Sequence, residues 1–300
     1  MSDSLSAELA ELKAAAAHND ARFQRIDKLS WPNGARIAVN VTVDFDAMLL
    51  RRLNNEPAME LAKGEFGGRV GVWRLLELFA AHRIKATIFT PGRICELYPE
   101  ALQAAVRGGH ELADHMWEHR VPKEPELARD HLGKTAAALQ AISGHRPVGS
   151  RSHYPASLLR EEGFIYNSHG ARSDRPYYVL DERGRPLVLE LPFHFAIDDA
   201  MFFSFAWYRS GNAGQRLADT DRVFDLWLAA FQQQHRQGGY LNICLHPFVS
   251  GRALRVAMLD RLIGAMKAYP GVWFASCEEV ARHCLATHPA SPTPESATSP

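Results

Sequence analysis

IAVNVTVDFD, residues 37–46, is the stretch of sequence from which the fold can be inferred. It begins as a run of apolar and β-branched residues, which is typical of a buried strand, and it ends in two aspartates, Asp44 and Asp46. A helical pattern follows over residues 70–82 (VGVWRLLELFAAH), and a second apolar run, ATIF, occupies residues 86–89. A strand, a helix and another strand in this order predict a parallel sheet covered by helices.

The same alternation continues along the chain. Helices are expected over residues 97–107, 126–142, 219–236, 254–269 and 278–286, and strands over 110–114, 148–151, 187–191 and 240–245. About seven strand-helix units in roughly 250 residues favour a (β/α) barrel, complete or irregular, over an open doubly wound sheet. No GxGxxG motif follows the first strand and no P-loop occurs, so a nucleotide-binding fold has no support.

Three parts of the chain are expected: a helical extension over 1–34, the barrel over 35–287 and a disordered tail over 288–300. Leu5, Leu9, Leu12 and Ala16 form one apolar stripe in the extension. A short helix cannot bury such a stripe alone, so it is predicted to pack on the barrel or on a neighbouring subunit, which makes a homo-oligomer the expectation. The tail is rich in Pro, Ser and Thr and has no apolar period.

The balance of positive and negative charges limits the kinds of partner that the protein is expected to bind. Lys plus Arg and Asp plus Glu both number 34, so neither nucleic acid nor an anionic membrane is expected to bind, and a small-molecule or glycan substrate is the easier expectation. No apolar run is long enough for a membrane span, and the acidic start resembles no secretory signal, which predicts a cytoplasmic protein. The four cysteines, which show no paired spacing, are interpreted as reduced core residues: Cys95, Cys244, Cys277 and Cys284.

Several chemically capable side chains stand at the predicted carboxyl ends of strands, where barrels gather their catalytic groups. Asp44 and Asp46 end the first strand, although a polar strand end with a capping aspartate is the alternative. His115 and His119 follow the strand over 110–114, and their spacing of four would place both imidazoles on one face of a helical turn.

Two further residues fit the same pattern. Arg151 ends the strand over 148–151 and could pair with a carboxylate there, or equally form a surface ion pair. His246 ends the strand over 240–245, where it could donate a proton to a leaving group, or be a turn residue before Pro247. One aspartate and two histidines at converging strand ends form the ligand set of a catalytic zinc-type site.

These motifs resemble the polysaccharide deacetylase family, carbohydrate esterase family 4, over residues 35 to 285. In that family an irregular (β/α) barrel carries two nearby aspartates, which correspond to Asp44 as base and Asp46 as metal ligand. Its second motif is similar to Gly109-His110-Glu111 followed by His115 and His119, the other two metal ligands. Its third motif resembles Arg151 and Tyr154, with Ser152 and His153 in place of the usual proline, and its last is similar to Leu245-His246-Pro247.

The stretch from Glu65 to Arg74 is similar to one branch of the family, which contains allantoinases, cyclic imide hydrolases and an intracellular-type peptidoglycan deacetylase. The resemblance implies that Asp44, oriented by Arg151, is the base and that His246 is the acid. It also suggests substrate contacts for Tyr154, Arg69 and Trp117. The segment from Phe193 to Gly214, rich in aromatics, is interpreted as a lid or as an irregular connection packed on the barrel.

The predicted function is therefore metal-dependent hydrolysis of carbon-nitrogen bonds other than peptide bonds. Small cyclic imides, ureides or amides are the first substrate hypothesis. The alternative is N-deacetylation of amino sugars in peptidoglycan or another polysaccharide, and a second alternative is an inactive barrel that serves as a binding module. One divalent ion is expected, with zinc first and cobalt, nickel or manganese as alternatives.

Overall fold

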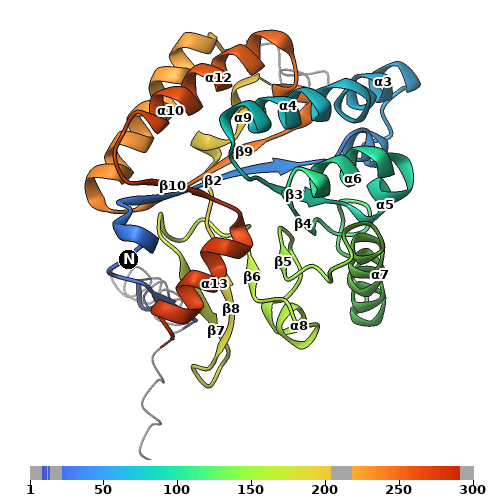
Figure 1. Ribbon diagram of the computed structural model, residues 1–300. Helices are drawn as coiled ribbons and strands as arrows, with labels where there is room; N and C mark the ends of the chain where they lie inside the picture. The colour runs from blue at the N-terminus through green and yellow to red at the C-terminus, as the bar shows by residue number, and fades with distance from the viewer. Residues whose placement is uncertain (1–8, 12, 14–21, 204–217, 291–300) are drawn as a thin grey trace, which may run out of the picture.

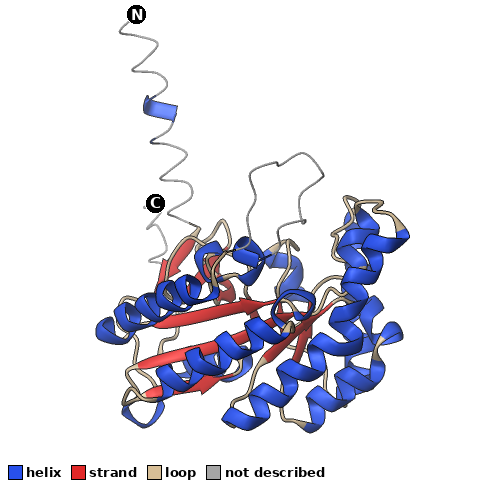
Figure 2. Cartoon of the chain, turned by 90° about the horizontal axis from the view of Figure 1, so that it is seen from above, coloured by secondary structure: helices blue, strands red, loops and turns tan. Residues whose placement is uncertain are grey.

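A mixed sheet surrounded by helices forms the body of the protein in the computed structural model, which describes residues 9–11, 13, 22–203 and 218–290 (Figures 1 and 2). The strands are β1 (Phe23–Arg25), β2 (Ile37–Asp44), β3 (Thr87–Thr90), β4 (Glu111–Asp114), β5 (Gly149–Ser150), β6 (Tyr166–Asn167), β7 (Tyr177–Leu180), β8 (Pro186–Glu190), β9 (Tyr240–Leu245) and β10 (Val272–Ala275). Of the predicted N-terminal stripe, Leu5, Leu12 and Ala16 lie outside the described residues, and Leu9 is described and exposed. Residues 291–300 of the predicted C-terminal tail also lie outside the described residues.

Helices connect and cover these strands. They are α2 (Leu49–Leu53), α3 (Ala58–Phe66), α4 (Val72–His82), α5 (Gly92–Leu97), α6 (Pro99–Arg107), α7 (Pro125–Ser143), α8 (Ala156–Glu161), α9 (Asp199–Phe203), α10 (Thr220–Gln237), α11 (Pro247–Ser250), α12 (Ala253–Lys267) and α13 (Cys277–Thr287). Shorter turns of helix are η1 (Pro32–Gly34), the π-helical η2 (Gly67–Gly71) and η3 (Phe195–Ile197). Among the described residues, no helix is both long and apolar enough to cross a membrane.

The sheet is parallel over most of its width. β2 pairs with β9 along one edge and with β3 and β10 along the other, and β3, β4, β5, β6 and β8 follow in parallel order. β7 and β1 extend it with antiparallel pairs. No ladder joins β8 to β9 within the described residues, and a single bridge from Asp198 to Cys244 lies beside this gap. This mixed α/β fold confirms the predicted irregular barrel, with a sheet that strand pairing does not close.

Strand β2 separates an apolar layer on one face from a polar interior on the other. All eight residues of β2 are buried, as the apolar run predicted. Ile37, Val39, Val41 and Val43 belong to the largest hydrophobic cluster, which includes residues of α4, α10 and α12. Asn40, Thr42 and Asp44 alternate with them and point to the other face. The period of two therefore turns the polar side chains of this strand into the barrel.

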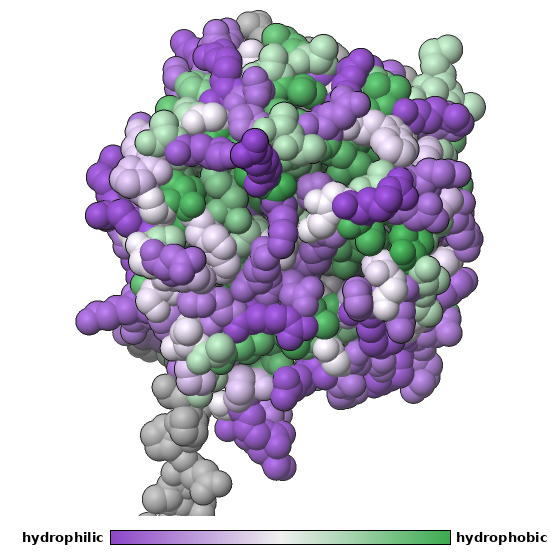
Figure 3. Space-filling model, viewed as in Figure 1, coloured by the Kyte–Doolittle hydropathy of each residue, from purple (hydrophilic) through white to green (hydrophobic). Residues whose placement is uncertain are grey.

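The face of the protein seen in Figure 1 is largely polar. Figure 3 shows hydrophilic side chains over most of the face seen in Figure 1, with apolar ones in small groups between them. The most exposed large apolar side chains of the described residues are distributed over separate elements: Met59, Leu254, Phe195 and Leu226. Single apolar residues of this kind are normal on protein surfaces and identify no binding patch.

The predicted helix over 70–82 begins differently in the structure. α4 covers residues 72–82, but the π-helical turn η2 and the additional helix α3 precede it. Gly67 and Gly71 explain this start, because their backbone packs directly against α11. A Cβ on Gly71 would lie 2.0 Å from the Pro247 carbonyl oxygen, and one on Gly67 would lie 3.0 Å from the Phe248 nitrogen. The glycines therefore allow this segment to contact the helix that follows His246.

We expect Gly71→Ala to lower the free energy of unfolding by about 1–3 kcal/mol, because a methyl group placed against backbone must push two helices apart. Gly133→Ala is the matched control. Gly133 lies inside α7, and no neighbouring atom of the described residues comes within 4 Å of the position that a methyl group would take there. Alanine should therefore raise stability by roughly 0.5–1 kcal/mol through helix propensity. Urea unfolding of both variants measures this difference, and equal midpoints would contradict the close contact.

Candidate active site

The six residues predicted to carry chemistry come together at the carboxyl ends of four strands of the parallel part of the sheet, in which β3 lies between β2 and β4 (Figure 1). They follow or end β2, β4, β5 and β9, and they are Asp44, Asp46, His115, His119, Arg151 and His246. All except His119 are buried. The convergence that the sequence predicted is therefore present in the structure.

Asp46, His115 and His119 form a compact cluster of ligand-type atoms. The Nε2 atom of His115 lies 3.3 Å from Asp46 Oδ1, and that of His119 lies 3.7 Å from the same oxygen. Both oxygens of Asp46 and Nε2 of His115 are buried without a hydrogen-bond partner among the described residues. Buried polar atoms normally have partners, so these three atoms indicate a ligand that completes the site.

The charges of this cluster favour a cation. Burial alone would raise the pKa of the Asp46 carboxyl, but His119 and His115 lower it, so the carboxylate is ionised. Burial alone would lower the pKa of His115, yet Asp44 and Asp46 raise it. His115 Nδ1 lies 2.5 Å from the Arg151 carbonyl oxygen, which accepts its N–H and leaves Nε2 directed at Asp46.

The two histidines do not lie on a helical turn, so that part of the sequence prediction was wrong. Residues 115–119 form an irregular turn in which Met116 and His119 have φ values of 66° and 59°. Such left-handed conformations cost about 1–3 kcal/mol each outside glycine. The Asp114 carboxylate stabilises the turn by accepting the N–H of Met116, and Gly92 N–H donates to the Met116 carbonyl. The turn brings both imidazoles to one carboxylate oxygen, as a helix would have done.

Asp44 is held by Arg151. Nη1 of Arg151 lies 2.5 Å from Asp44 Oδ1, and both side chains are almost fully buried. Burial alone would raise the pKa of the Asp44 carboxyl, but Arg151, with His115 and His246, holds it below its usual value. The other oxygen, Oδ2, faces Nε2 of His115 at 3.7 Å and Nε2 of His246 at 4.0 Å. One oxygen of Asp44 is therefore fixed and the other faces the cluster.

The guanidinium of Arg151 is fixed from several sides. Its Nη2 donates to Thr42 Oγ1 and to Ser168 Oγ, and its Nε donates to the Ser168 carbonyl. The rings of Phe89 and Phe193 lie 4.1 and 4.4 Å from its central carbon. These contacts exclude the surface ion pair that was the alternative for Arg151. Phe193 comes from the segment interpreted as a lid or a connection, and its described half packs on the barrel.

His246 is paired with an aspartate that the sequence interpretation missed. Nδ1 of His246 lies 2.7 Å from Asp199 Oδ1, and the backbone N–H of His246 donates to Asp199 Oδ2 at 2.8 Å. Burial alone would lower the pKa of His246, but Asp199, Asp198 and Asp44 raise it to about 10. The signal was available, because Asp198 and Asp199 are the acidic residues in an aromatic stretch, FHFAIDDAMFF.

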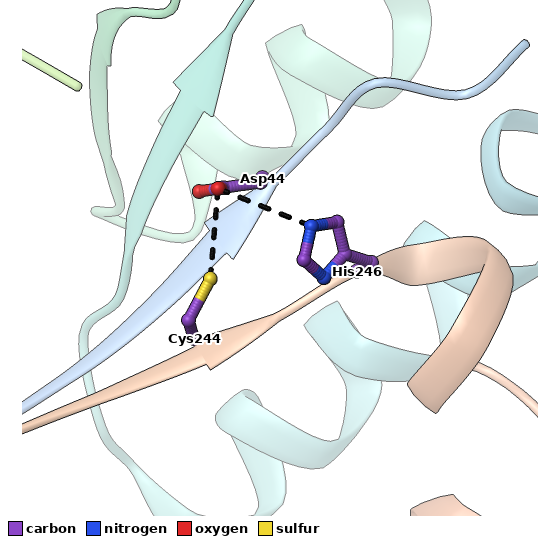
Figure 4. Close-up of side chains that lie close together, drawn as sticks. All are labelled: Asp44, Cys244 and His246. Carbon is purple, nitrogen blue, oxygen red and sulfur yellow. Dashed lines mark hydrogen bonds and ion pairs between the residues drawn. The ribbon is translucent and has the colours of Figure 1, made fainter. Parts of the chain in front are cut away.

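All four cysteines are free and buried, as predicted, and Cys244 in addition lies in the site. Figure 4 shows Cys244 and His246, from the end of β9, directed at Asp44. The Cys244 sulfur lies 3.5 Å from Asp44 Oδ2 and accepts from Arg151 Nη1 at 3.2 Å. A guanidinium already supplies positive charge here, so this group of ligand-type atoms suits a metal less well than Asp46, His115 and His119.

The three residues suggested as substrate contacts lie elsewhere. The side chain of Tyr154 is buried in a cluster with Met116 and Leu132, and its N–H donates to Ser152 Oγ at 3.4 Å. Trp117 is buried beneath two cations, with Lys134 and Arg93 over its ring. Arg69 is exposed and pairs with Glu65 on the same helical segment. None of the three side chains joins the six clustered residues, and their contact with substrate stays a prediction.

Comparisons with known proteins agree with this geometry. The family model for polysaccharide deacetylase matches residues 65–170, a range that includes His115, His119 and Arg151. A protein named peptidoglycan deacetylase from Helicobacter pylori is 26% identical, with 84% of this chain and 97% of that protein covered. An allantoinase structure, Puue, has a TM-score of 0.76 and 27% identity, with 87% and 94% of the two chains covered.

A solved structure from Mycobacterium smegmatis, assigned to the polysaccharide deacetylases, is more similar still. Its TM-score is 0.79 and its identity 31%, over 93% of this chain and 99% of that one. The relatives named here are hydrolases of carbon-nitrogen bonds outside peptides, which is the enzyme class that the sequence predicted. Sequence motifs, fold and relatives lead to one conclusion: the chain belongs to the polysaccharide deacetylase family.

Proposed function

We propose that this protein is a metal-dependent hydrolase that opens a carbon-nitrogen bond in a small cyclic imide, ureide or amide. The observation that carries the proposal is the juxtaposition of an incomplete ligand cluster, a carboxylate fixed by Arg151 and an imidazole fixed by Asp199. Metal ligands, a base and an acid are the three parts of metal-assisted amide hydrolysis. Their presence together argues against an inactive barrel.

The residues fit a divalent ion. Asp46, His115 and His119 offer one oxygen and two nitrogens, all within 4.8 Å of one another. Ligand atoms of a tetrahedral zinc site are roughly 3.4 Å apart, since each lies about 2.1 Å from the ion. The separations of 3.3 and 3.7 Å from Asp46 Oδ1 match this spacing, and the atoms without partners are those that would bind. Zinc is the first choice, with cobalt, nickel and manganese as alternatives.

When bound, a divalent ion polarises a carbonyl oxygen and lowers the pKa of water. The chain supplies the proton transfers. Asp44 accepts a proton from the attacking water through Oδ2, because Oδ1 is bound to Arg151. His246 carries the proton that the departing nitrogen needs, since Asp199 binds Nδ1 and Nε2 faces both aspartates of β2's end at 3.9 and 4.0 Å. The base Asp44 and the acid His246 therefore face each other across the site from the neighbouring strands β2 and β9.

A small substrate is favoured by the burial of the reacting groups. Among the six clustered residues, only the side chain of His119 is appreciably exposed, at 25%. A compact ring can present its carbonyl at so recessed a centre more easily than a glycan strand can. The similarity to the allantoinase supports this choice, because its name implies a cyclic ureide substrate. N-deacetylation of an amino sugar is the second candidate, and the Helicobacter pylori relative supports it.

A hydrolysis panel on protein of known metal content tests the proposal. It includes succinimide, hydantoin, allantoin and N-acetylated chitooligosaccharides. We expect turnover of at least one cyclic compound and little release of acetate from the oligosaccharides. Acetate release without any ring opening would replace the first candidate by the second, and no turnover in the presence of zinc, cobalt, nickel or manganese would contradict both.

A further inference from the structure

Two exposed histidines that the proposed mechanism does not use lie next to each other beside the site. His153 is two residues beyond Arg151, and His169 is two residues beyond the end of β6. Their ring centroids are 3.9 Å apart with an interplanar angle of 64°. β5 and β6 are parallel neighbours, so the loops after them emerge at the same end of the sheet as the clustered residues. The two imidazoles therefore stand at the rim of the site.

A buried network holds both loops in place. The side chain of Asn167 accepts from the N–H of Ser152 and donates to its carbonyl, at 3.2 and 3.3 Å. The same amide donates to Glu190, whose other oxygen accepts the N–H groups of His169 and Gly170 at 2.5 and 2.6 Å. Asn167, Glu190 and Ser152 are all buried. The exposed rings are thus displayed by a rigid support, which is what a binding site requires.

Both rings are close enough to the site to interact with it electrostatically. Burial, then the charge of His115, lowers the pKa of His153. The pKa of His169 is lowered to about 4. Partial burial of its ring is the largest cause, and the positive charges of His153, Arg151 and His115 add to it. Two imidazolium ions could not share so short a distance without strong repulsion. Each neutral imidazole offers one N–H donor and one acceptor nitrogen, so the pair presents donor and acceptor side by side.

We propose that His153 and His169 form the substrate-recognition pair of this enzyme and bind the syn carbonyl and N–H edge of a cyclic imide or ureide. This inference rests on the proposed function and deepens it. In a small ring the carbonyl oxygen and the adjacent N–H are locked on the same edge. In the acetamido group of an amino sugar the amide is trans, because the cis form of such an amide is strongly disfavoured, so its oxygen and N–H point in opposite directions. A paired donor and acceptor therefore distinguishes the two substrate classes.

The test uses the cyclic imide that the wild type hydrolyses best and its N-methyl derivative, which lacks the N–H. His153→Phe and His169→Phe keep a ring but remove the hydrogen bonds. Each should lower kcat/KM for the imide about tenfold or more, mainly through KM, because lost hydrogen bonds to a polar substrate cost of this order. The loss should be clearly smaller for the N-methyl compound. His169→Gln, which restores a donor and an acceptor, should recover part of the activity.

His145→Phe is the matched control, since His145 is an exposed histidine in the turn after α7 and should change neither substrate's kinetics. Metal content should stay equal in all variants. Equal losses on both compounds, unchanged imide kinetics or a loss of metal would each overturn the recognition role while leaving the proposed function intact. If the wild type cleaves only N-acetylated oligosaccharides, the proposed cyclic substrate is contradicted, and so is the recognition role of His153 and His169.

Discussion

Asp44→Asn is expected to retain its metal ion and to lose at least about two orders of magnitude in kcat, because a positioned general base contributes roughly 10²- to 10⁴-fold. Asparagine keeps the shape of the side chain, and its amide oxygen can still accept from Arg151 in place of Oδ1. What it cannot do is receive a proton at the position of Oδ2, which faces His115 and His246. The loss should therefore appear in turnover and not in metal affinity.

Asp46→Asn is the matched comparison, because Asp46 lies two residues away at the same strand end and, among the described residues, pairs with histidines and with no arginine. Both of its oxygens lack hydrogen-bond partners among the described residues. This variant should lose metal, and its activity should recover in part when excess metal is added. Thermal unfolding of both variants checks that each one folds. Identical behaviour of the two, in metal content and in rescue, would contradict the division of roles between the aspartates.

The second large effect is expected at His246. His246→Ala should lower kcat by about 10²- to 10⁴-fold on substrates with a poor leaving group, because the departing nitrogen then lacks its acid. An imide expels a resonance-stabilised amide nitrogen, which needs less protonation than an amine does. The loss should therefore grow with the basicity of the leaving group across a series of imides and amides. A uniform loss over the series would mean that His246 is structural.

Asp199→Asn tests whether the charge of Asp199 sets the pKa of His246, because the substitution removes that charge and keeps the imidazole in position. Burial lowers that pKa and the Asp199 carboxylate raises it, so removing the negative charge must lower it. The imidazolium then deprotonates at a lower pH, and the alkaline limb of kcat/KM should move to lower pH by at least about one unit. The amide of asparagine still accepts from Nδ1, which keeps the ring oriented. An alkaline limb that stays in place would show that Asp199 does not control the acid.

Much of the site could be predicted because strands in a parallel sheet end at the same edge. Asp44, His115, Arg151 and His246 each stand at the carboxyl end of a strand predicted from the sequence, and this position alone brought them together. The apolar run of β2 was equally informative, because it predicted a buried strand, and all eight residues of β2 are buried. Both patterns are local in the sequence, yet each of them is compatible with only one arrangement of these residues in the fold.

Other features depend on contacts that no local pattern records. Asp199 reaches His246 from the segment that bridges to β9 beside the gap between β8 and β9, across 47 positions of sequence. The turn over 115–119 has the spacing of a helix, but the Asp114 carboxylate and the backbone of Gly92 hold it in another conformation. Strands of two residues, such as β5 and β6, are too short for periodicity to identify their limits. In each case tertiary contacts decide the conformation.

The central claim is that Asp46, His115 and His119 hold one divalent ion on which hydrolysis depends. Elemental analysis of purified wild type and His115→Ala, each loaded with zinc and dialysed, tests it most directly, with the exposed His145→Ala as control. We expect about one ion per chain in the wild type and the control and far less in His115→Ala, since it retains only two of three ligands. Equal metal content in all three proteins would contradict the site.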